Sequence, residues 1–195
     1  MKKQFLDEEQ LVLDSFRLGV SIFESGFRPT FIVGLWRGGS TIGIYVQECL
    51  QTLGVETDHI SLRTSYRGQE HYLQRIGSAE PEIRVHGTQY LLENLNADDG
   101  LLIVDDVFST GHSVEAVINR LSKHLKRNMP KDVRIATLYQ RPALNKTDIQ
   151  PDYSLHSTDD WLVFPYEMSG LSMDEIREHK SYLNQIIQDM EVSSQ

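Results

Sequence analysis

The sequence has little cysteine: Cys49 is the only one in 195 residues. A single cysteine cannot form an intrachain disulfide, and it cannot supply a cysteine-clustered zinc site. Long apolar runs are also absent, since none approaches the roughly 18 residues that a membrane-spanning helix needs. The opening residues carry two lysines but reach acidic residues before any apolar stretch forms, so we expect no secretory signal peptide. These features indicate a cytosolic protein with no membrane partner.

Positive charge is scarce as well. The chain has 19 Lys and Arg against 28 Asp and Glu, which gives a formal net charge of −9. This balance excludes a broad basic surface for duplex DNA, so we expect no nucleic-acid partner. A small anionic substrate would need a local positive site to overcome the field of the whole protein. With 39% hydrophobic and 24% charged residues and no repeat or linker, the chain is expected to fold as one globular domain, residues 1–195.

Short apolar runs alternate with stripes of apolar residues at helical spacing. Residues 31–35 are typical of a strand buried on both faces, and residues 42–53 predict a helix that ends at Gly54. The same unit recurs as a strand over 101–104 and a helix over 114–125. Further strands are predicted over 58–62, around 89–92, over 134–139 and over 161–164. A helix is predicted over 6–23, with the apolar stripe Leu6, Leu13, Phe16, Val20 and Phe23. A C-terminal helix is predicted to open with a capping box at Ser172–Glu175 and to continue through Leu183, Ile187 and Met190. This alternation predicts an α/β fold with a mostly parallel twisted sheet flanked by helices.

Residues 63–84 fit neither the helical nor the strand period. The stretch is rich in Arg, Glu, Gln and Gly. Loops of about 20 residues without secondary structure are uncommon inside a compact domain, and they often serve as lids or binding loops. A solvated insertion is the equal alternative at this point.

The most informative segment is L-L-I-V-D-D-V-F-S-T-G-H-S-V, residues 101–114. Ligands of open parallel sheets bind beyond the carboxyl ends of the strands, and Asp105 and Asp106 are predicted to begin a polar loop at such an end. The backbone N–H groups and three hydroxyls that follow, before a helix, suit a phosphate. The residues of this predicted phosphate loop are Ser109, Thr110, Gly111, His112 and Ser113. The segment lacks the lysine of a Walker A loop and the glycines of a dinucleotide site.

Two carboxylates beside a phosphate cradle would repel a bare phosphate. Each like-charged pair at 4 Å costs about 4 kcal/mol at an effective dielectric constant near 20. The arrangement is favourable if Asp105 and Asp106 face sugar hydroxyls or a magnesium ion, which makes a ribose 5-phosphate the predicted ligand. The alternative is that the two acids form an ordinary turn and that the Ser, Thr and Gly residues merely cap the helix.

The strand followed by V-D-D-V-x-x-T-G-x-S resembles the phosphoribosyl-pyrophosphate (PRPP) signature of type I phosphoribosyltransferases, and the resemblance covers roughly residues 30–170. It implies the fold of that family, with a core over about 30–140, a mobile lid over about 63–84, and a small hood with the C-terminal helix over about 141–195. It also implies Mg²⁺ as cofactor and a homodimer or homotetramer.

Two further segments carry the resemblance. F-I-V-G-L-W-R-G-G, residues 31–39, is similar to the first strand and pyrophosphate loop of the family, which implies that Trp36, Arg37 and Gly38 hold pyrophosphate and that the Trp36–Arg37 peptide is cis. R-T-S-Y-R, residues 63–67, is similar to the lid of the hypoxanthine, guanine and xanthine enzymes, with Ser65 and Tyr66 as its Ser-Tyr pair.

Residues 160–167, D-W-L-V-F-P-Y-E, resemble the base-binding strand and hood of xanthine-guanine-type enzymes. The resemblance implies that Trp161 stacks on the purine, that the main chain of Leu162 bonds its exocyclic edge, and that Glu167 lies near the magnesium ion of Asp105 and Asp106. The alternative is a core tryptophan and a surface glutamate.

Arg141 falls where relatives carry a lysine that donates a hydrogen bond to O6 of the purine. A cationic donor at this position favours a 6-oxo group over the 6-amino group of adenine. An arginine can make that bond, although its planar fork differs from an ammonium. A solvated arginine beside Pro142 is the alternative.

The chain departs from the 6-oxopurine branch at Ser109, where relatives carry an aspartate that accepts the N7 proton. A missing general base can cost roughly 10²–10⁴ in rate. The resemblance implies Asp105, Asp106, Ser109 and Arg37 as catalytic residues. The expected reaction transfers the phosphoribosyl group of PRPP to N9 of hypoxanthine, guanine or xanthine. It gives the nucleoside monophosphate and pyrophosphate in purine salvage. Ser109 keeps a nucleotide-sensing regulator without turnover open, and a pyrimidine acceptor is the third alternative.

Overall fold

The computed structural model describes residues 3–66, 83–184, 186 and 188. The chain divides into two compact units, one of residues 12–159 and a smaller one of residues 1–11 with 160–195. Helix α1 (Glu8–Glu24) contributes residues to both units. Within the described residues, every helix is too short or too polar to cross a membrane.

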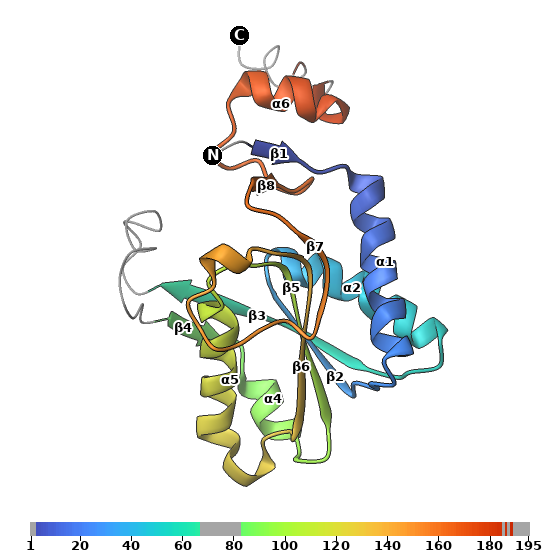
Figure 1. Ribbon diagram of the computed structural model, residues 1–195, viewed down its shortest axis with the longest axis vertical. Coiled ribbons are helices and arrows are strands. Elements are labelled where there is room, and N and C mark those ends of the chain that lie inside the picture. Colours follow the sequence, from blue (N-terminus) through green and yellow to red (C-terminus); the bar gives the residue numbers. More distant parts are fainter. Residues whose placement is uncertain (1–2, 67–82, 185, 187, 189–195) are drawn as a thin grey trace. The chain divides into compact units, whose positions relative to one another are not determined.

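The larger unit is built on a six-stranded sheet in the order β4-β3-β2-β5-β6-β7 (Figure 1). The strand β4 pairs antiparallel with β3, and the other neighbouring pairs are parallel. The strands are β2 (Phe31–Trp36), β3 (Asp58–Tyr66), β4 (Ile83–His86), β5 (Gly100–Phe108), β6 (Asp132–Gln140) and β7 (Tyr153–Ser157). The mostly parallel α/β sheet predicted from the sequence is therefore confirmed.

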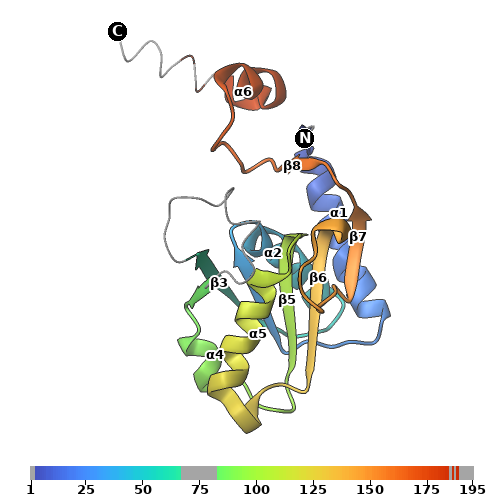
Figure 2. The ribbon, with the colours of Figure 1, turned by 60° about the vertical axis from the view of Figure 1, so that its left-hand side comes forward.

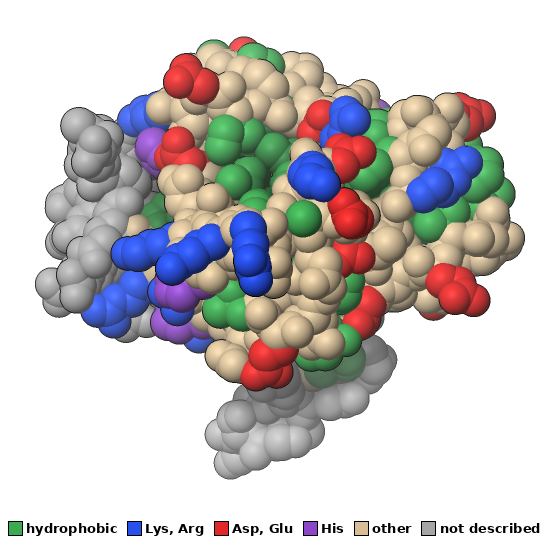
Figure 3. All heavy atoms as spheres, turned by 90° about the horizontal axis from the view of Figure 1, so that it is seen from below, with side chains coloured by type: hydrophobic (Ala, Val, Ile, Leu, Met, Phe, Trp, Pro, Cys, Tyr) green, Lys and Arg blue, Asp and Glu red, His purple; other side chains and the backbone are tan. Residues whose placement is uncertain are grey.

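Helices cover both faces of this sheet. Figure 2 shows α4 (Gln89–Asn94) and α5 (His112–Leu125) on one face and α2 (Gly38–Thr52) on the other. Short 3-10 turns η1 (Lys126–Asn128) and η2 (Pro142–Leu144) follow α5 and β6. Basic residues lie at the end of α5, with Lys123 in its last turn and Lys126 and Arg127 in η1. Figure 3, which views the molecule from below, shows Lys and Arg side chains gathered on part of that face. Cations at a helix C-terminus complement the helix dipole.

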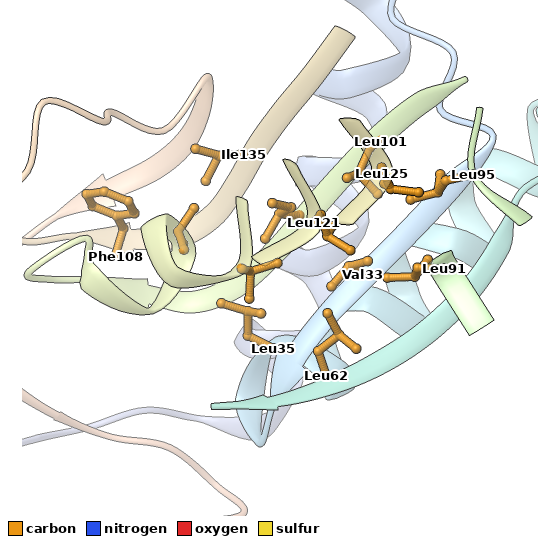
Figure 4. Close-up of a cluster of buried hydrophobic side chains, with 13 residues drawn as sticks. Val33, Leu35, Leu62, Leu91, Leu95, Leu101, Phe108, Leu121, Leu125 and Ile135 are labelled. Atoms are coloured by element: carbon orange, nitrogen blue, oxygen red, sulfur yellow. The ribbon is translucent and has the colours of Figure 1, made fainter. Parts of the chain in front are cut away.

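A hydrophobic core fills the space between the sheet and helices α4 and α5 (Figure 4). Alternate residues of the strands face this side because side chains of a strand point to opposite faces in turn. Its members include Val33 and Leu35 of β2, Leu62 of β3, Leu101 and Ile103 of β5, Leu91 of α4, and Leu121 and Leu125 of α5. The core holds β2 and β5 side by side, and both strands lead into the predicted site.

One element of this unit was predicted with the wrong type of secondary structure. The strand expected around 89–92 is the helix α4, because Gly87, with φ +88°, ends β4 and the chain turns to bury Leu91. A short apolar run does not distinguish a strand from one turn of helix.

The helix predicted over 6–23 exists, but its buried face differs from the apolar stripe of the sequence. Leu13, Phe16 and Val20 are exposed, whereas Asp14 is only 2% exposed. One Asp14 oxygen accepts a bond from Arg17 Nη1 at 3.0 Å, and the other lies 2.7 Å from His156 Nε2 on β7. The buried face of α1 therefore carries Leu11, Leu18 and Ile22 together with the polar Asp14, in place of the predicted stripe.

The smaller unit pairs the two ends of the chain. Strand β1 (Lys3–Phe5) runs parallel to β8 (Trp161–Val163). The predicted capping box is confirmed at the start of α6 (Met173–His179). The long C-terminal helix is wrong in its extent, because α6 ends before Lys180 and a 3-10 turn, η3 (Ser181–Leu183), follows. Ile187 and Met190 of that prediction lie outside the described residues.

Candidate functional site

The acidic pair lies inside a strand rather than in a loop. The sequence predicted that the strand ends at 104, but β5 continues to Phe108 because it stays paired with β6 as far as the Phe108–Gln140 pair. Asp105 therefore pairs with Thr137 of β6, and Asp106 lies between this pair and the Val107–Tyr139 pair, near the carboxyl end of the strand. This is where open parallel sheets bind their ligands.

The two carboxylates are close to each other and to the backbone. The Asp106 N–H donates to Asp105 Oδ1 at 3.0 Å, and the Val107 N–H donates to Asp106 Oδ1 at 2.8 Å. Asp105 keeps part of its surface exposed, yet burial, followed by the neighbouring charge of Asp106, raises the pKa of Asp105 well above its ordinary value. A hydroxyl donor or a cation at this point would stabilise the ionised form.

Residues 109–113 lead directly from β5 into α5. Gly111 is the N-cap and has φ +80°, a left-handed conformation that favours glycine. No side chain caps the start of α5 by a hydrogen bond. The first N–H groups of a 14-residue helix are thus not occupied by a capping side chain, as an anion site at a helix N-terminus requires.

A second loop supports this turn, and the sequence did not predict it. A Cβ atom on Gly111 would lie 2.2 Å from Thr147 Oγ1 and 3.0 Å from Asn145 Oδ1. The Lys146 N–H donates to the Thr110 carbonyl at 3.1 Å. The glycine in the motif was a signal for close approach, but nothing in the sequence identified residues 145–147 as the neighbour.

The predicted pyrophosphate loop lies beside the acidic pair. The Trp36–Arg37 peptide is cis, as the resemblance implied. Trp36 and Arg37 are exposed, whereas Gly38 is buried at the start of α2. A Cβ atom on Gly39 would lie 2.9 Å from Asp105 Cα, so the loop and β5 are in direct backbone contact.

Arg141 follows β6 next to the predicted phosphate loop. Its N–H donates to the Phe108 carbonyl at 2.9 Å, and its Nη2 donates to the Asp159 carbonyl at 3.0 Å. The residue is 8% exposed, which excludes the alternative of a solvated surface arginine. A buried guanidinium near the strand ends is an oriented donor.

The ends of the predicted lid form an antiparallel pair. Residues 63–66 complete β3, and Ser65 is opposite Arg84 of β4. The Ser65 hydroxyl lies 3.0 Å from His86 Nε2. Tyr66 is the last residue of β3, and residues 67–82 of the predicted lid lie outside the described residues.

Two of the predicted base-binding residues, Trp161 and Leu162, belong to the smaller unit, whereas Arg141 and Asp105 belong to the larger unit. Trp161 is 38% exposed, which excludes a core tryptophan, and Leu162 is buried in β8. Glu167 Oε2 accepts the Phe164 N–H at 3.1 Å. Among the described residues, no cluster of three or more His, Cys, Asp or Glu side chains could hold a metal ion by itself.

Comparisons with known proteins agree with this arrangement. A family model described as the phosphoribosyl transferase domain matches residues 1–172. The purine phosphoribosyltransferase of Pyrococcus horikoshii Ot3 is 26% identical, with a TM-score of 0.64 over 88% of this chain and 98% of that chain. A comparison with curated proteins found no match.

Two other solved structures are similar in fold. The xanthine-guanine-hypoxanthine phosphoribosyltransferase of Helicobacter pylori is 18% identical, with a TM-score of 0.61 over 91% of this chain and 99% of that chain. A hypothetical protein from Neisseria gonorrhoeae with bound ppGpp is 17% identical, with a TM-score of 0.70 over 93% of this chain and 97% of that chain.

Proposed function

Because the chain belongs to the phosphoribosyltransferase family, we propose that it transfers the phosphoribosyl group of PRPP to N9 of hypoxanthine, guanine or xanthine. The products are the purine nucleoside monophosphate and pyrophosphate, and the role is purine salvage in the cytoplasm. One observation carries the proposal. The acidic pair on β5, the uncapped start of α5 and the cis-peptide loop before α2 lie together in one unit, with Gly39 against Asp105.

In this proposal the ribose 5-phosphate binds across the end of β5. Backbone N–H groups and hydroxyls of Ser109, Thr110 and Ser113, with Gly111 and His112 between them, hold the phosphate at the helix start. Asp105 and Asp106 accept hydrogen bonds from the ribose hydroxyls. The raised pKa of Asp105 supports this role, because such donors offset the cost of its buried charge.

The donor set fits a magnesium ion. Mg²⁺ is commonly held by one or two carboxylates together with substrate oxygens and water, and Asp105 and Asp106 supply two adjacent carboxylates. A bound magnesium ion would neutralise charge on the leaving pyrophosphate. We propose Glu167 as a further residue near this ion. The Glu167 carboxylate accepts a hydrogen bond from the Phe164 N–H, which orients the side chain within the smaller unit.

The chain's own residues stabilise the leaving group as well. Arg37 is exposed at the cis-peptide loop, and the Gly38 amide opens α2 beside it. In this proposal the Arg37 cation and the Gly38 N–H face the departing pyrophosphate and stabilise the charge that develops on it. Electrostatic stabilisation of this kind is usually the largest single contribution to a rate. Ser65 and Tyr66, at the edge of the lid, would exclude water from the reacting C1′ carbon.

We assign the choice of base to Arg141, Trp161 and Leu162. The buried Arg141 guanidinium would donate a hydrogen bond to a 6-oxo group. The 6-amino group of adenine cannot accept such a bond. An aromatic face such as that of Trp161 contributes about 1–3 kcal/mol against a base. The purine enzymes of P. horikoshii and H. pylori among the similar structures support a purine acceptor.

The test is an assay of the purified protein with PRPP, magnesium and single bases. We expect nucleotide and pyrophosphate in equal amounts with at least one of hypoxanthine, guanine and xanthine, and none with adenine. Turnover of orotate or uracil instead would support the pyrimidine alternative. Purine turnover that persists with unchanged KM after Trp161→Ala and Arg141→Met would contradict the assigned base site.

A nucleotide-sensing regulator is the second candidate. Two observations favour it: Ser109 replaces the expected general base, and the similar protein of N. gonorrhoeae binds ppGpp. Tight binding of PRPP or a guanine nucleotide without turnover of any base would support this candidate over the transferase.

We also propose a homodimer or homotetramer. Leu13, Phe16 and Val20 form an exposed apolar stripe on α1, and such surfaces are commonly covered by another chain. Light scattering on the wild type and on a Phe16→Glu variant tests this. A variant of unchanged mass would contradict an interface on the stripe.

A further inference from the structure

The family match ends at residue 172, and the segment that follows folds back on the residues after β8. Figure 1 shows α6 next to the strand pair β1 and β8 within the smaller unit. The Lys3 ammonium pairs with Glu175 at 2.6 Å, and the His179 ring stacks on Phe5 at 3.8 Å. The C-terminal segment is therefore anchored to β1, the partner strand of β8.

Lys180 links this segment to the loop that leaves β8. Its Nζ donates to the Phe164 carbonyl and to the Pro165 carbonyl, each at 2.9 Å. The Tyr182 hydroxyl donates to the same Pro165 carbonyl at 3.0 Å. Lys180 is 3% exposed, so the ammonium makes these bonds away from bulk water.

The loop itself is closed by Glu167. The Phe164 N–H donates to Glu167 Oε2 at 3.1 Å, and the Glu167 N–H donates to the Phe164 carbonyl at 3.0 Å. On the other side, the Leu6 N–H donates to the Val163 carbonyl at 3.0 Å. The backbone that carries Trp161 and Leu162 is thus fixed by β1 along its length and by Lys180 just beyond its end.

A buried ammonium is expensive unless its donors are satisfied. Burial lowers the pKa of Lys180, and the nearby Glu167 charge opposes that shift. If the ammonium were removed, the Phe164 carbonyl would keep only the Glu167 N–H as donor, and the Pro165 carbonyl only the Tyr182 hydroxyl. The stronger, charged hydrogen bonds between the C-terminal segment and the loop would be lost. Lys180 therefore fixes the loop, although an apolar residue would be easier to bury.

We propose that Lys180 is a positioning residue for the base: it sets the conformation of residues 164–167 and thereby the orientation of Trp161 and the Leu162 main chain. This inference rests on the proposed transferase function. Lys180 does not touch the reacting atoms, so its loss should change recognition of the base more than the chemical step. Residues that bind PRPP in the larger unit should not respond.

The experiment compares Lys180→Met with a matched control, Arg177→Met, on the exposed side of α6. We expect Lys180→Met to raise KM for the purine about tenfold, the loss that follows from removing charged hydrogen bonds. The KM for PRPP should stay within about twofold, and Arg177→Met should resemble the wild type. Lys180→Arg should recover part of the loss because it restores a cationic donor.

A readout without turnover accompanies the kinetics. Hydrogen exchange of the Phe164 and Glu167 amides should be faster in Lys180→Met, whereas exchange in β5 should be unchanged. If Lys180→Met does not fold, Tyr182→Phe removes a single donor to Pro165 at an exposed side chain, and a rise of about twofold to threefold in the purine KM is expected.

The outcomes separate this inference from the proposed function. If the wild type is active and Lys180→Met keeps the wild-type KM for the purine, the positioning role alone is overturned. If Lys180→Met does not fold, an unchanged purine KM in Tyr182→Phe overturns it in the same way. A larger effect on the KM for PRPP than on that for the purine also overturns it. A wild type that converts no purine overturns the proposed function, and the base-positioning role with it.

Discussion

Gly39 lies so close to Val104 that a methyl group at Gly39 would be 2.3 Å from the Val104 carbonyl oxygen. This contact brings the start of α2 against the end of β5. It explains why a glycine is needed in the loop after the cis peptide, since any side chain would separate the predicted pyrophosphate loop from the acidic pair.

A Gly39→Ala variant should therefore lose activity while keeping its fold. Displacing the loop by about 1 Å can cost roughly 10² in rate, and we expect kcat/KM for PRPP to fall by about that factor. Steady-state kinetics and circular dichroism measure the two effects. Glu48→Ala, on the exposed side of the same helix, is the control. Near wild-type activity in Gly39→Ala would place the reacting groups elsewhere.

Asp105→Asn should separate stability from function. The pKa of Asp105 is raised in the folded state, so the unfolded chain loses this proton first as pH rises, and ionisation opposes folding at neutral pH. Removing the charge should raise Tm by roughly 2–4 °C at neutral pH, whereas kcat/KM should fall at least about tenfold. Calorimetry and the assay measure both. The exposed Asp148→Asn should change neither, and a lower Tm for Asp105→Asn would contradict this account.

Ser109→Asp tests the departure from the 6-oxopurine branch. If Ser109 leaves the N7 proton without an efficient acceptor, the aspartate should raise kcat with hypoxanthine, by as much as about 10². Ser109→Asn has the same shape without the base and should give no gain. Equal rates for the wild type and Ser109→Asp would mean that another group accepts the proton or that chemistry is not rate-limiting.

His59 should make the protein less stable in mild acid. Its Nδ1 lies 3.2 Å from Gln47 Oε1, and its Nε2 is buried with no hydrogen-bond partner among the described residues. Burial lowers the pKa of His59 from 6.5, and Asp58 only partly opposes this shift. The unfolded chain therefore binds the proton first as pH falls, and stability is lost from about pH 7 downward.

Urea unfolding at about pH 7.5 and about pH 5.5 measures this loss. His59→Gln should lose less stability between the two conditions than the wild type, whereas His124→Gln, at an exposed position, should not differ from it. An identical pH dependence in all three proteins would assign the acid sensitivity to other groups.

The sequence predicted the parts of the site that follow one another along the chain. Asp105 to Ser113 and the Trp36–Arg37 loop come from local patterns, and the parallel sheet brings their ends together. The extent of β5 was missed because the two acids do not resemble strand residues. It is the pairing with β6 that keeps them in the ladder.

Contacts between distant segments were not predictable in the same way. Thr147, which lies close to Gly111, belongs to a loop and comes 36 positions later in the chain. The burial of Asp14 on α1 was missed because its partner His156 lies on β7, and a polar contact adds nothing to an apolar pattern. Lys180 bonds to the carbonyls of Phe164 and Pro165, which lie 16 and 15 positions earlier, and no local pattern predicts these contacts.

The pairing of β1 with β8 has a consequence for how the molecule is made. Synthesis proceeds from the N-terminus, and domains generally begin to fold as they emerge. All six strands of the large sheet precede Trp161–Val163 in the order of synthesis, whereas Lys3–Phe5 is synthesised before any of them. The smaller unit can therefore form only after β8 has been synthesised, late in translation, and a tag fused ahead of Lys3 would lie next to the strand that must then pair with β8.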